Sequence, residues 1–131
     1  MFETNVLGIF YLIKQVVPEM KENKYGHIIN ISSIAGITGI EKMSAYNATK
    51  FAVKGLSESL FKELRPDGIK VTCIFPGSVE TSFFDHLDEA FKKNPNKMDP
   101  NEVADSIIYC LSSSASFHPV NLELRPFNFP R

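Results

Sequence analysis

Apolar residues near the start of the chain recur every three or four positions, at 6, 9, 10, 13, 16, 17 and 20. This spacing predicts a helix with one broad face buried against the rest of the protein. Pro18 has no backbone N–H, so we expect it to bend the helix near its end. A break in the pattern follows at Lys24 to Gly26.

Two stripes of side chains run along a second predicted helix, from about Ser44 to Leu64. The first stripe is apolar and contains Val53, Leu56, Leu60 and Leu64. The second contains only small residues, namely Ala48, Ala52, Gly55 and Ser59. Small side chains permit close approach of a neighbouring helix, and we expect this stripe to meet one.

A third helix is predicted after Asp99, where the sequence DPNE contains three start signals. Aspartate is a favoured N-cap, proline suits the first helical position, and Glu102 can close a capping box. The buried face of this helix is expected to comprise Val103, Ala104, Ile107, Ile108 and Leu111.

Three segments are predicted to be strands: HIINIS at 27–32, IKVTCIF at 69–75 and VNLELRP at 120–126. The first is rich in isoleucine and is expected to be buried on both faces, as in a parallel sheet. Helices and strands alternate along the chain, and this order predicts an α/β fold with parallel strands and right-handed crossovers. A chain of 131 residues is long enough for one domain with one core.

The composition of the chain argues against nucleic-acid and membrane partners. Hydrophobic residues make up 44% of the chain, charged residues 22%, and the formal net charge is -1. Because Lys and Arg form no long run, nucleic acid and anionic membrane surfaces are poor partners. No apolar run reaches the roughly 20 residues of a membrane span, and the N-terminus does not resemble a signal peptide.

Cysteine and histidine usage predicts a reducing, cytoplasmic setting without a metal site. Cys73 and Cys110 each lie in an apolar stretch and are expected to be buried thiols rather than a disulfide. The histidines, at 27, 86 and 118, lack metal-ligand spacing and are interpreted as structural or surface residues.

The sharpest candidate for chemistry is the pair Tyr46 and Lys50, four residues apart on the second predicted helix. This spacing puts both side chains on one face, one turn apart. A phenol has a pKa of about 10, and a nearby ammonium lowers it, so the pair could move a proton near neutral pH. Taken alone, the same spacing is typical of an ordinary surface pair.

Two further features fall at strand ends, where ligands bind in parallel α/β sheets. Ser33 follows the first predicted strand, and its hydroxyl could donate to a carbonyl oxygen that gains negative charge. Ser32 and Ser33 could equally satisfy backbone groups of the loop, which is the simpler interpretation for Ser32. Pro76 and Gly77 directly follow the second strand and lie at the same edge.

Four segments together resemble the classical short-chain dehydrogenase/reductase family, in that family's order and spacing. They are TNVLG, which resembles the catalytic-asparagine segment, then NISSIAG, YNATK and FPGSVET. The resemblance covers nearly the whole chain and implies a partial Rossmann-type domain over residues 1–131. This would be the catalytic, C-terminal portion of a doubly wound parallel sheet, without the N-terminal dinucleotide-binding strands.

The resemblance implies an oxidoreductase that transfers a hydride between NAD(P) and a carbonyl or secondary alcohol. Tyr46 would be the general acid/base, Ser33 would polarise the substrate carbonyl, and Asn5 would hold a proton relay. Without the resemblance, Asn5 is better interpreted as a polar residue on a helix face. Lys50 would lower the tyrosine pKa and bind the nicotinamide ribose. The other cofactor-binding positions would be Pro76, Gly77, Val79 and Thr81.

The resemblance also implies a cofactor preference and an assembly. The closing VNLELRP resembles members that use NADP and reduce small carbonyls or oxidise hydroxy acids, which favours NADP over NAD. A homodimer or homotetramer is expected through the helices near 6–20 and 44–64. In the segment 82–98, four residues are expected to form either an apolar lid over the substrate or part of the core: Phe83, Phe84, Leu87 and Phe91.

One family element does not occur in the sequence. The family opens with a Gly-rich turn that binds the pyrophosphate, and the chain contains neither G-x-x-x-G-x-G nor G-x-G-x-x-G. We therefore expect a truncated form of the family domain, whose own cofactor binding and activity are in question. The alternative function is an inactive fragment or a non-catalytic association subunit of such an enzyme.

Overall fold

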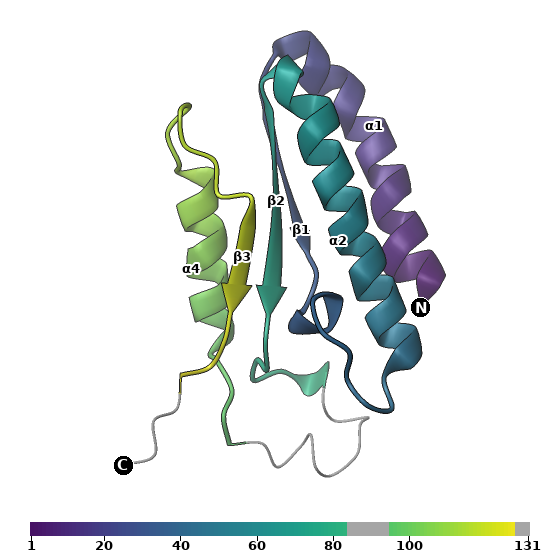
Figure 1. Cartoon of the computed structure of the whole chain (residues 1–131). Helices are drawn as coiled ribbons and strands as arrows, with labels where there is room; N and C mark the ends of the chain where they lie inside the picture. The colour runs from purple at the N-terminus through teal and green to yellow at the C-terminus, as the bar shows by residue number, and fades with distance from the viewer. Residues whose placement is uncertain (84–94, 128–131) are drawn as a thin grey trace.

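The computed structural model describes residues 1–83 and 95–127 of the chain. Three strands form one parallel sheet in the order β1 (Gly26–Ile31), β2 (Ile69–Pro76) and β3 (Asn121–Leu124). Figure 1 shows α1 and α2 side by side on one side of the sheet and α4 on the other. This arrangement confirms the predicted α/β class and corresponds to part of a doubly wound sheet.

The helices lie close to the predicted bounds. A π-helical turn, η1 (Glu3–Leu7), leads directly into α1 (Gly8–Asn23), so the helix continues beyond Pro18. Helix α2 spans Ser44–Leu64, and α4 spans Pro100–Leu111. The predicted capping box at α4 is confirmed, because Asp99 accepts from a backbone N–H and Glu102 accepts from the backbone N–H of Asp99.

The core is built around β2, the central strand. Every residue of β2 is buried except Lys70, which is half-buried, because β2 has a strand on each side and helices over its faces. One cluster joins α1, β1, α2 and β2 and consists of Ile13, Ile28, Leu64, Ile69 and Val71. A second joins α2 to β2 and consists of Val53, Cys73 and Phe75. Both cysteines are buried and unpaired, as predicted.

The prediction that HIINIS is buried on both faces is wrong for this structure. Within the described residues, β1 pairs only with β2 and lies at an edge of the sheet. Ile31 is therefore 40% exposed, and Ile29 is half-buried. The predicted buried face of α1 is also less buried than its pattern indicates, since Phe10 is 43% exposed.

The two stripes of α2 differ in burial. The apolar stripe faces the sheet, with Val53 and Leu64 buried. Gly55, in the small-residue stripe, is exposed, and a Cβ placed there would meet no atom within 4 Å. Among the described residues, then, no other helix of the chain closely approaches the stripe at Gly55.

A polar cluster holds the loop that follows α4 against the N-terminal half of β2. The Lys70 ammonium donates to the backbone oxygens of Ser114 and Phe117, both at 2.7 Å, and to the Ser113 hydroxyl at 2.9 Å. His118 Nε2 lies 3.1 Å from the Val71 nitrogen and 2.9 Å from its oxygen, at the edge where β3 later pairs. His118 therefore continues the hydrogen bonding of the sheet beyond the start of β3, which confirms a structural role.

Candidate functional site

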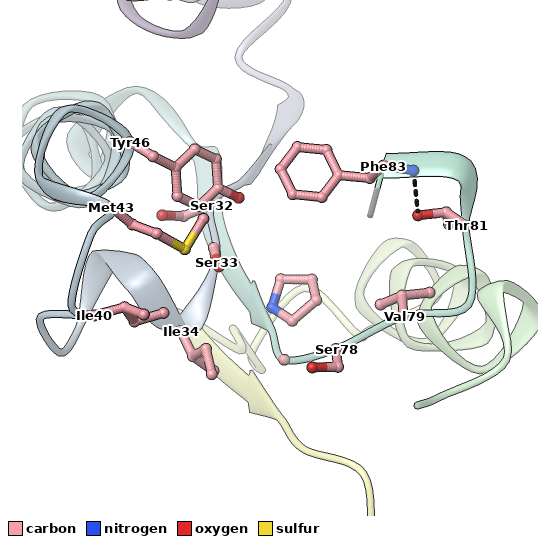
Figure 2. A pocket seen from close by; sticks show the side chains of 12 residues that line it. Ser32, Ser33, Ile34, Ile40, Met43, Tyr46, Ser78, Val79, Thr81 and Phe83 are labelled. Carbon is pink, nitrogen blue, oxygen red and sulfur yellow. Dashed lines mark hydrogen bonds between the residues drawn. The ribbon is translucent and has the colours of Figure 1, made fainter. Parts of the chain in front are cut away.

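The C-terminal edge of the sheet carries a cavity of about 210 Å³ between the ends of β1 and β2 and the start of α2. In Figure 2, Ser33 and Tyr46 approach it from one side, and Val79, Thr81 and Phe83 from the other. The described lining is formed by Ser32, Ser33, Ile34, Ile40, Met43, Tyr46, Pro76, Gly77, Ser78, Val79, Thr81 and Phe83. The structure thus brings together six of the eight site residues expected from the sequence: Ser33, Tyr46, Pro76, Gly77, Val79 and Thr81.

Ser33 is oriented by the single turn that follows β1. It is the N-cap of η2 (Ile34–Gly36), where its Oγ accepts a hydrogen bond from the Ala35 N–H at 3.1 Å. Because a hydroxyl has one proton and two lone pairs, this contact leaves the O–H of Ser33 able to donate into the cavity. A hydrogen bond with Ser33 lowers the pKa of Tyr46, which agrees with donation towards the phenol oxygen.

Ser32 has a structural role, as its simpler interpretation predicted. It is buried, and its hydroxyl donates to the backbone oxygen of Lys50 at 2.9 Å, which ties the end of β1 to α2. The same close approach requires a glycine at position 36. A Cβ on Gly36 would lie 2.5 Å from Ser32 Oγ and 2.7 Å from the Lys50 oxygen.

The direction of the Tyr46 pKa shift differs from the expectation. Burial is the largest influence and raises its pKa, and the hydrogen bond with Ser33 acts in the opposite direction. The Lys50 ammonium lies 5.6 Å from the Tyr46 ring centroid and donates to the Ile31 backbone oxygen at 3.3 Å. The predicted lowering of the tyrosine pKa by Lys50 is therefore not present in this arrangement of the two side chains.

Burial also affects Lys50, and it lowers the pKa of the ammonium, with a smaller opposing effect from Cys73. Lys50 is not among the residues that line the cavity, although it is close to the Tyr46 ring. Its contact with the carbonyl oxygen of Ile31 places the ammonium at the end of β1, on the same edge of the sheet as the cavity.

Asn5 lies outside the cavity lining but is linked to the Tyr46 turn of α2. Its Nδ2 donates to Thr49 Oγ1 at 3.3 Å, and this hydroxyl donates to the Tyr46 backbone oxygen at 2.8 Å. Asn5 lies within the π-helical turn η1, where the Gly8 N–H bonds to the Glu3 oxygen. Single π-helical turns in helices occur frequently at functional sites.

Sequence reasoning missed several residues of the site. Thr49 is fully buried and joins Asn5 to Tyr46. A hydroxyl three residues after Tyr46 was an available signal, since threonine often bonds a backbone oxygen one turn earlier. Ile40 and Met43 also line the cavity, and their position just before α2 was the available signal.

The segment after β2 is held in place by backbone contacts. The Gly77 N–H donates to the Leu124 oxygen at 2.7 Å, and a Cβ on Gly77 would approach that oxygen to 3.3 Å. Val79 forms an isolated parallel bridge with Met98. These contacts set the distance between the far wall of the cavity and Tyr46, and Phe83 stands 5.7 Å from Tyr46 between ring centroids. Phe84, Leu87 and Phe91 lie outside the described residues.

The residues present fit one end of a nicotinamide dinucleotide. The cavity presents a proton-bearing phenol, a serine hydroxyl and an apolar wall, which suit a planar nicotinamide ring and a carbonyl substrate. Across residues 1–83 and 95–127, no group of His, Cys, Asp or Glu side chains could hold a metal ion. No helix in those residues is both long and apolar enough to cross a membrane.

Comparison with known proteins decides the family. The family model for short chain dehydrogenases matches residues 1–92. The chain belongs to this family. The resemblance seen in the four sequence motifs is therefore confirmed, and each motif of the short-chain dehydrogenase lies where the structure places the cavity or the helices around it.

Relatives of this short-chain dehydrogenase chain include an uncharacterized oxidoreductase of Staphylococcus saprophyticus, 36% identical over 96% of this chain and 53% of the relative. A 3-alpha-(or 20-beta)-hydroxysteroid dehydrogenase of Mycobacterium tuberculosis is 41% identical over 88% of this chain and 45% of the relative. The solved closed form of a serine dehydrogenase with NADP+ is 32% identical, with a TM-score of 0.89, covering 100% of this chain and 59% of that protein. The chain thus spans about half the length of the curated relatives that it matches.

Proposed function

We propose that the protein containing this chain is a nicotinamide-dependent oxidoreductase acting on a carbonyl or secondary alcohol. One observation carries the proposal. Ser33, from the end of β1, and Tyr46, from α2, reach the same cavity at the C-terminal edge of a parallel sheet. Names of relatives support it, since they are oxidoreductases and dehydrogenases.

The bound nicotinamide would supply or accept the hydride, and the residues of this chain would manage the proton. Tyr46 would donate its phenolic proton to the carbonyl oxygen during reduction and take it back during oxidation. Burial keeps the Tyr46 proton in place, because it raises the pKa of the phenol. The Ser33 O–H would orient the same carbonyl oxygen and stabilise the charge that develops on it.

Lys50 and Asn5 would support the proton transfer from outside the cavity. Lys50 would contact the nicotinamide ribose and favour the tyrosinate, which requires the ammonium to exchange its Ile31 contact for the ribose. Asn5 would hold the proton relay through its link to Thr49. Pro76, Gly77, Val79 and Thr81 would bind the nicotinamide and phosphate side, a placement supported by their position in the lining.

Replacement of the phenol tests this mechanism. In a complete protein of this family that contains the chain, Tyr46→Phe should abolish turnover and leave the cofactor dissociation constant nearly unchanged, because only the proton is removed. Lys50→Ala should lower turnover and also raise the cofactor dissociation constant. Turnover and cofactor binding are measured for each variant, with Tyr25→Phe, at an 80% exposed tyrosine, as the matched control. Near-normal turnover of Tyr46→Phe would refute the mechanism.

The finer properties are proposals as well. We propose NADP over NAD, supported by the NADP+ bound to the serine dehydrogenase that is 32% identical. A reducing compartment, the cytoplasm, is supported by two buried cysteines that form no disulfide.

A homodimer or homotetramer through α1 and α2 is supported by Tyr11, Leu12 and Phe51, which are exposed on these helices. Those exposed residues and the edge strand β1 also favour the second candidate, a non-catalytic association subunit.

A further inference from the structure

The cavity beside Tyr46 has no charged side chain among the residues that the structure describes in its lining. Its apolar part is formed by Ile34, Ile40, Met43, Pro76, Val79 and Phe83. We propose that its substrate is an uncharged carbonyl compound, or the corresponding alcohol, that bears an apolar group, and that Met43 and Phe83 select that group. The inference rests on the function proposed above and names the substrate class for the same site.

Met43 and Phe83 approach the reacting position from two elements. Met43 directly precedes α2, three residues before Tyr46, and both side chains line the cavity (Figure 2). Phe83 comes from the segment after Thr81, whose hydroxyl accepts from the Phe83 N–H at 3.4 Å. A group attached to a carbonyl carbon at the Tyr46 hydroxyl would therefore lie between a flexible thioether and an aromatic ring. Both are surfaces that favour apolar contact.

A charged substituent would meet no counter-ion among the described residues of these walls. The Lys50 ammonium lies 5.6 Å from the Tyr46 ring centroid, but Lys50 does not line the cavity, and its ammonium donates to the Ile31 oxygen. A carboxylate placed beside Met43 would exchange water for apolar atoms without an ionic partner, and such burial is strongly unfavourable. The carbonyl oxygen itself would have two donors, the hydroxyls of Ser33 and Tyr46.

Two probes of the same shape separate the alternatives. Acetophenone and phenylglyoxylate share a phenyl ketone, but the second carries a carboxylate in place of the methyl group. The chain contains four methionines, Met1, Met20, Met43 and Met98, so methyl-labelled methionine gives four NMR signals, and Met43→Leu assigns one of them. Acetophenone should shift the Met43 methyl saturably, and phenylglyoxylate should bind at least about tenfold more weakly. Met20 lines a different apolar groove, and its methyl reports nonspecific binding.

A charge introduced at the selecting wall should reverse the preference. Met43→Lys should tighten the binding of phenylglyoxylate relative to acetophenone by about tenfold or more, because it supplies the missing partner. Ile37→Lys is the matched control, since Ile37 is 38% exposed in the preceding loop and does not line the cavity. Binding of each probe to both variants is measured from the line broadening of the free probe's signals, because Met43→Lys no longer has a Met43 methyl signal.

The outcomes distinguish this inference from the proposed function, because probe binding requires neither nicotinamide nor turnover. Phenylglyoxylate binding at Met43 as tightly as acetophenone would overturn the inference. So would an unshifted Met43 methyl with both probes. An inactive enzyme that still binds acetophenone at Met43 would refute the proposed oxidoreductase and leave the apolar selection standing. An active enzyme that prefers phenylglyoxylate would support the proposed oxidoreductase and overturn the apolar selection.

Discussion

Tyr46 and Lys50 illustrate how burial competes with charge at the scale of single residues. The spacing of the pair predicted that the ammonium would lower the phenol pKa. In the structure, burial raises the pKa of Tyr46 and lowers that of Lys50, so each group is held towards its neutral form. The sequence placed the two residues on one face of α2, but the rotamer that carries Lys50 to Ile31 depends on β1, which is distant in the chain.

Thr49 is the residue through which Asn5 reaches the site, and it provides a test of that link. Replacing the buried hydroxyl by a methyl group in Thr49→Val removes the bond from Asn5 and the bond to the Tyr46 oxygen. We expect a loss of about 1–2 kcal/mol in the free energy of unfolding, because the Asn5 amide is left without its partner. Urea unfolding of Thr49→Val measures it. Thr49→Ser keeps the hydroxyl and should retain most of the stability, and an equal loss in both variants would contradict the role of the bond.

His27 makes the stability of the chain dependent on pH. Burial, together with His118 and Lys70, lowers the pKa of His27 from 6.5 to about 4. Between about pH 6.5 and pH 4 the unfolded chain binds a proton at His27 that the folded chain does not bind. The stability from the neutral ring is therefore complete above about pH 6.5 and is lost as the pH falls through about 4.

The comparison of wild type with His27→Gln isolates this effect from the titration of carboxylates. Between those pH values we expect the free energy of unfolding of the variant to fall by about 1–2 kcal/mol less than that of wild type. The effect is this small because the His27 ring is partly exposed to solvent. Glutamine can still donate to Thr72 Oγ1, which His27 Nε2 contacts at 2.8 Å. Parallel pH profiles of unfolding in the two proteins would show that His27 does not titrate as described.

At the scale of elements, α2 serves two surfaces. Its apolar stripe covers β2, while the face around Gly55 stays open and carries Phe51, which is 44% exposed. The pattern of small residues was visible in the sequence. What it meets could not be predicted, because an exposed small-residue face is compatible with an intramolecular helix or with another chain.

Gly55→Trp tests whether the open face of α2 is an interface. The position has free space around it, so the indole should not disturb the fold of the chain itself. If α1 and α2 form the contact between copies, the variant should shift the mass measured by light scattering towards monomer. Glu63→Trp, at an exposed site near the end of α2, controls for the added bulk. An unchanged oligomer with an intact circular-dichroism spectrum would place the interface elsewhere.

For the strands too, the sequence predicted the element, while the neighbouring strands decided how deeply it is buried. The sequence HIINIS predicted a strand correctly, but its burial was overestimated because burial requires a neighbour on each side. β2 has both neighbours and is buried along almost its whole length, whereas β1 has one within the described residues. An apolar, unpaired strand edge of this kind favours pairing with another chain.

At the scale of the whole molecule, the described site supplies contacts to only part of a dinucleotide. The cavity residues fit the nicotinamide end, and the sequence contains no Gly-rich turn of the kind that binds a pyrophosphate. We expect the 131-residue chain, made by itself, to show no saturable binding of NADH or NADPH at low micromolar concentration. The few contacts available cannot offset the entropy of fixing a dinucleotide.

Titration of NADH and NADPH into the purified chain, followed by nicotinamide fluorescence and heat, measures this binding. The serine dehydrogenase that was solved with NADP+ serves as the positive control under the same conditions. Intact mass confirms that the chain tested has all 131 residues. Saturable binding at low micromolar concentration would show that the residues described here form a sufficient cofactor site.

The sequence by itself determined the local features of this protein. It determined the helix periods, the capping box at Asp99, the residues at the strand ends and the family motifs around Ser33 and Tyr46. All depend on neighbours a few positions away. The tertiary structure decided the exposure of β1, the directions of the Tyr46 and Lys50 pKa shifts, the link through Thr49 and the uncharged walls at Met43 and Phe83. These depend on contacts between distant segments, which no local pattern encodes, because burial and electrostatics are set by everything that surrounds a side chain.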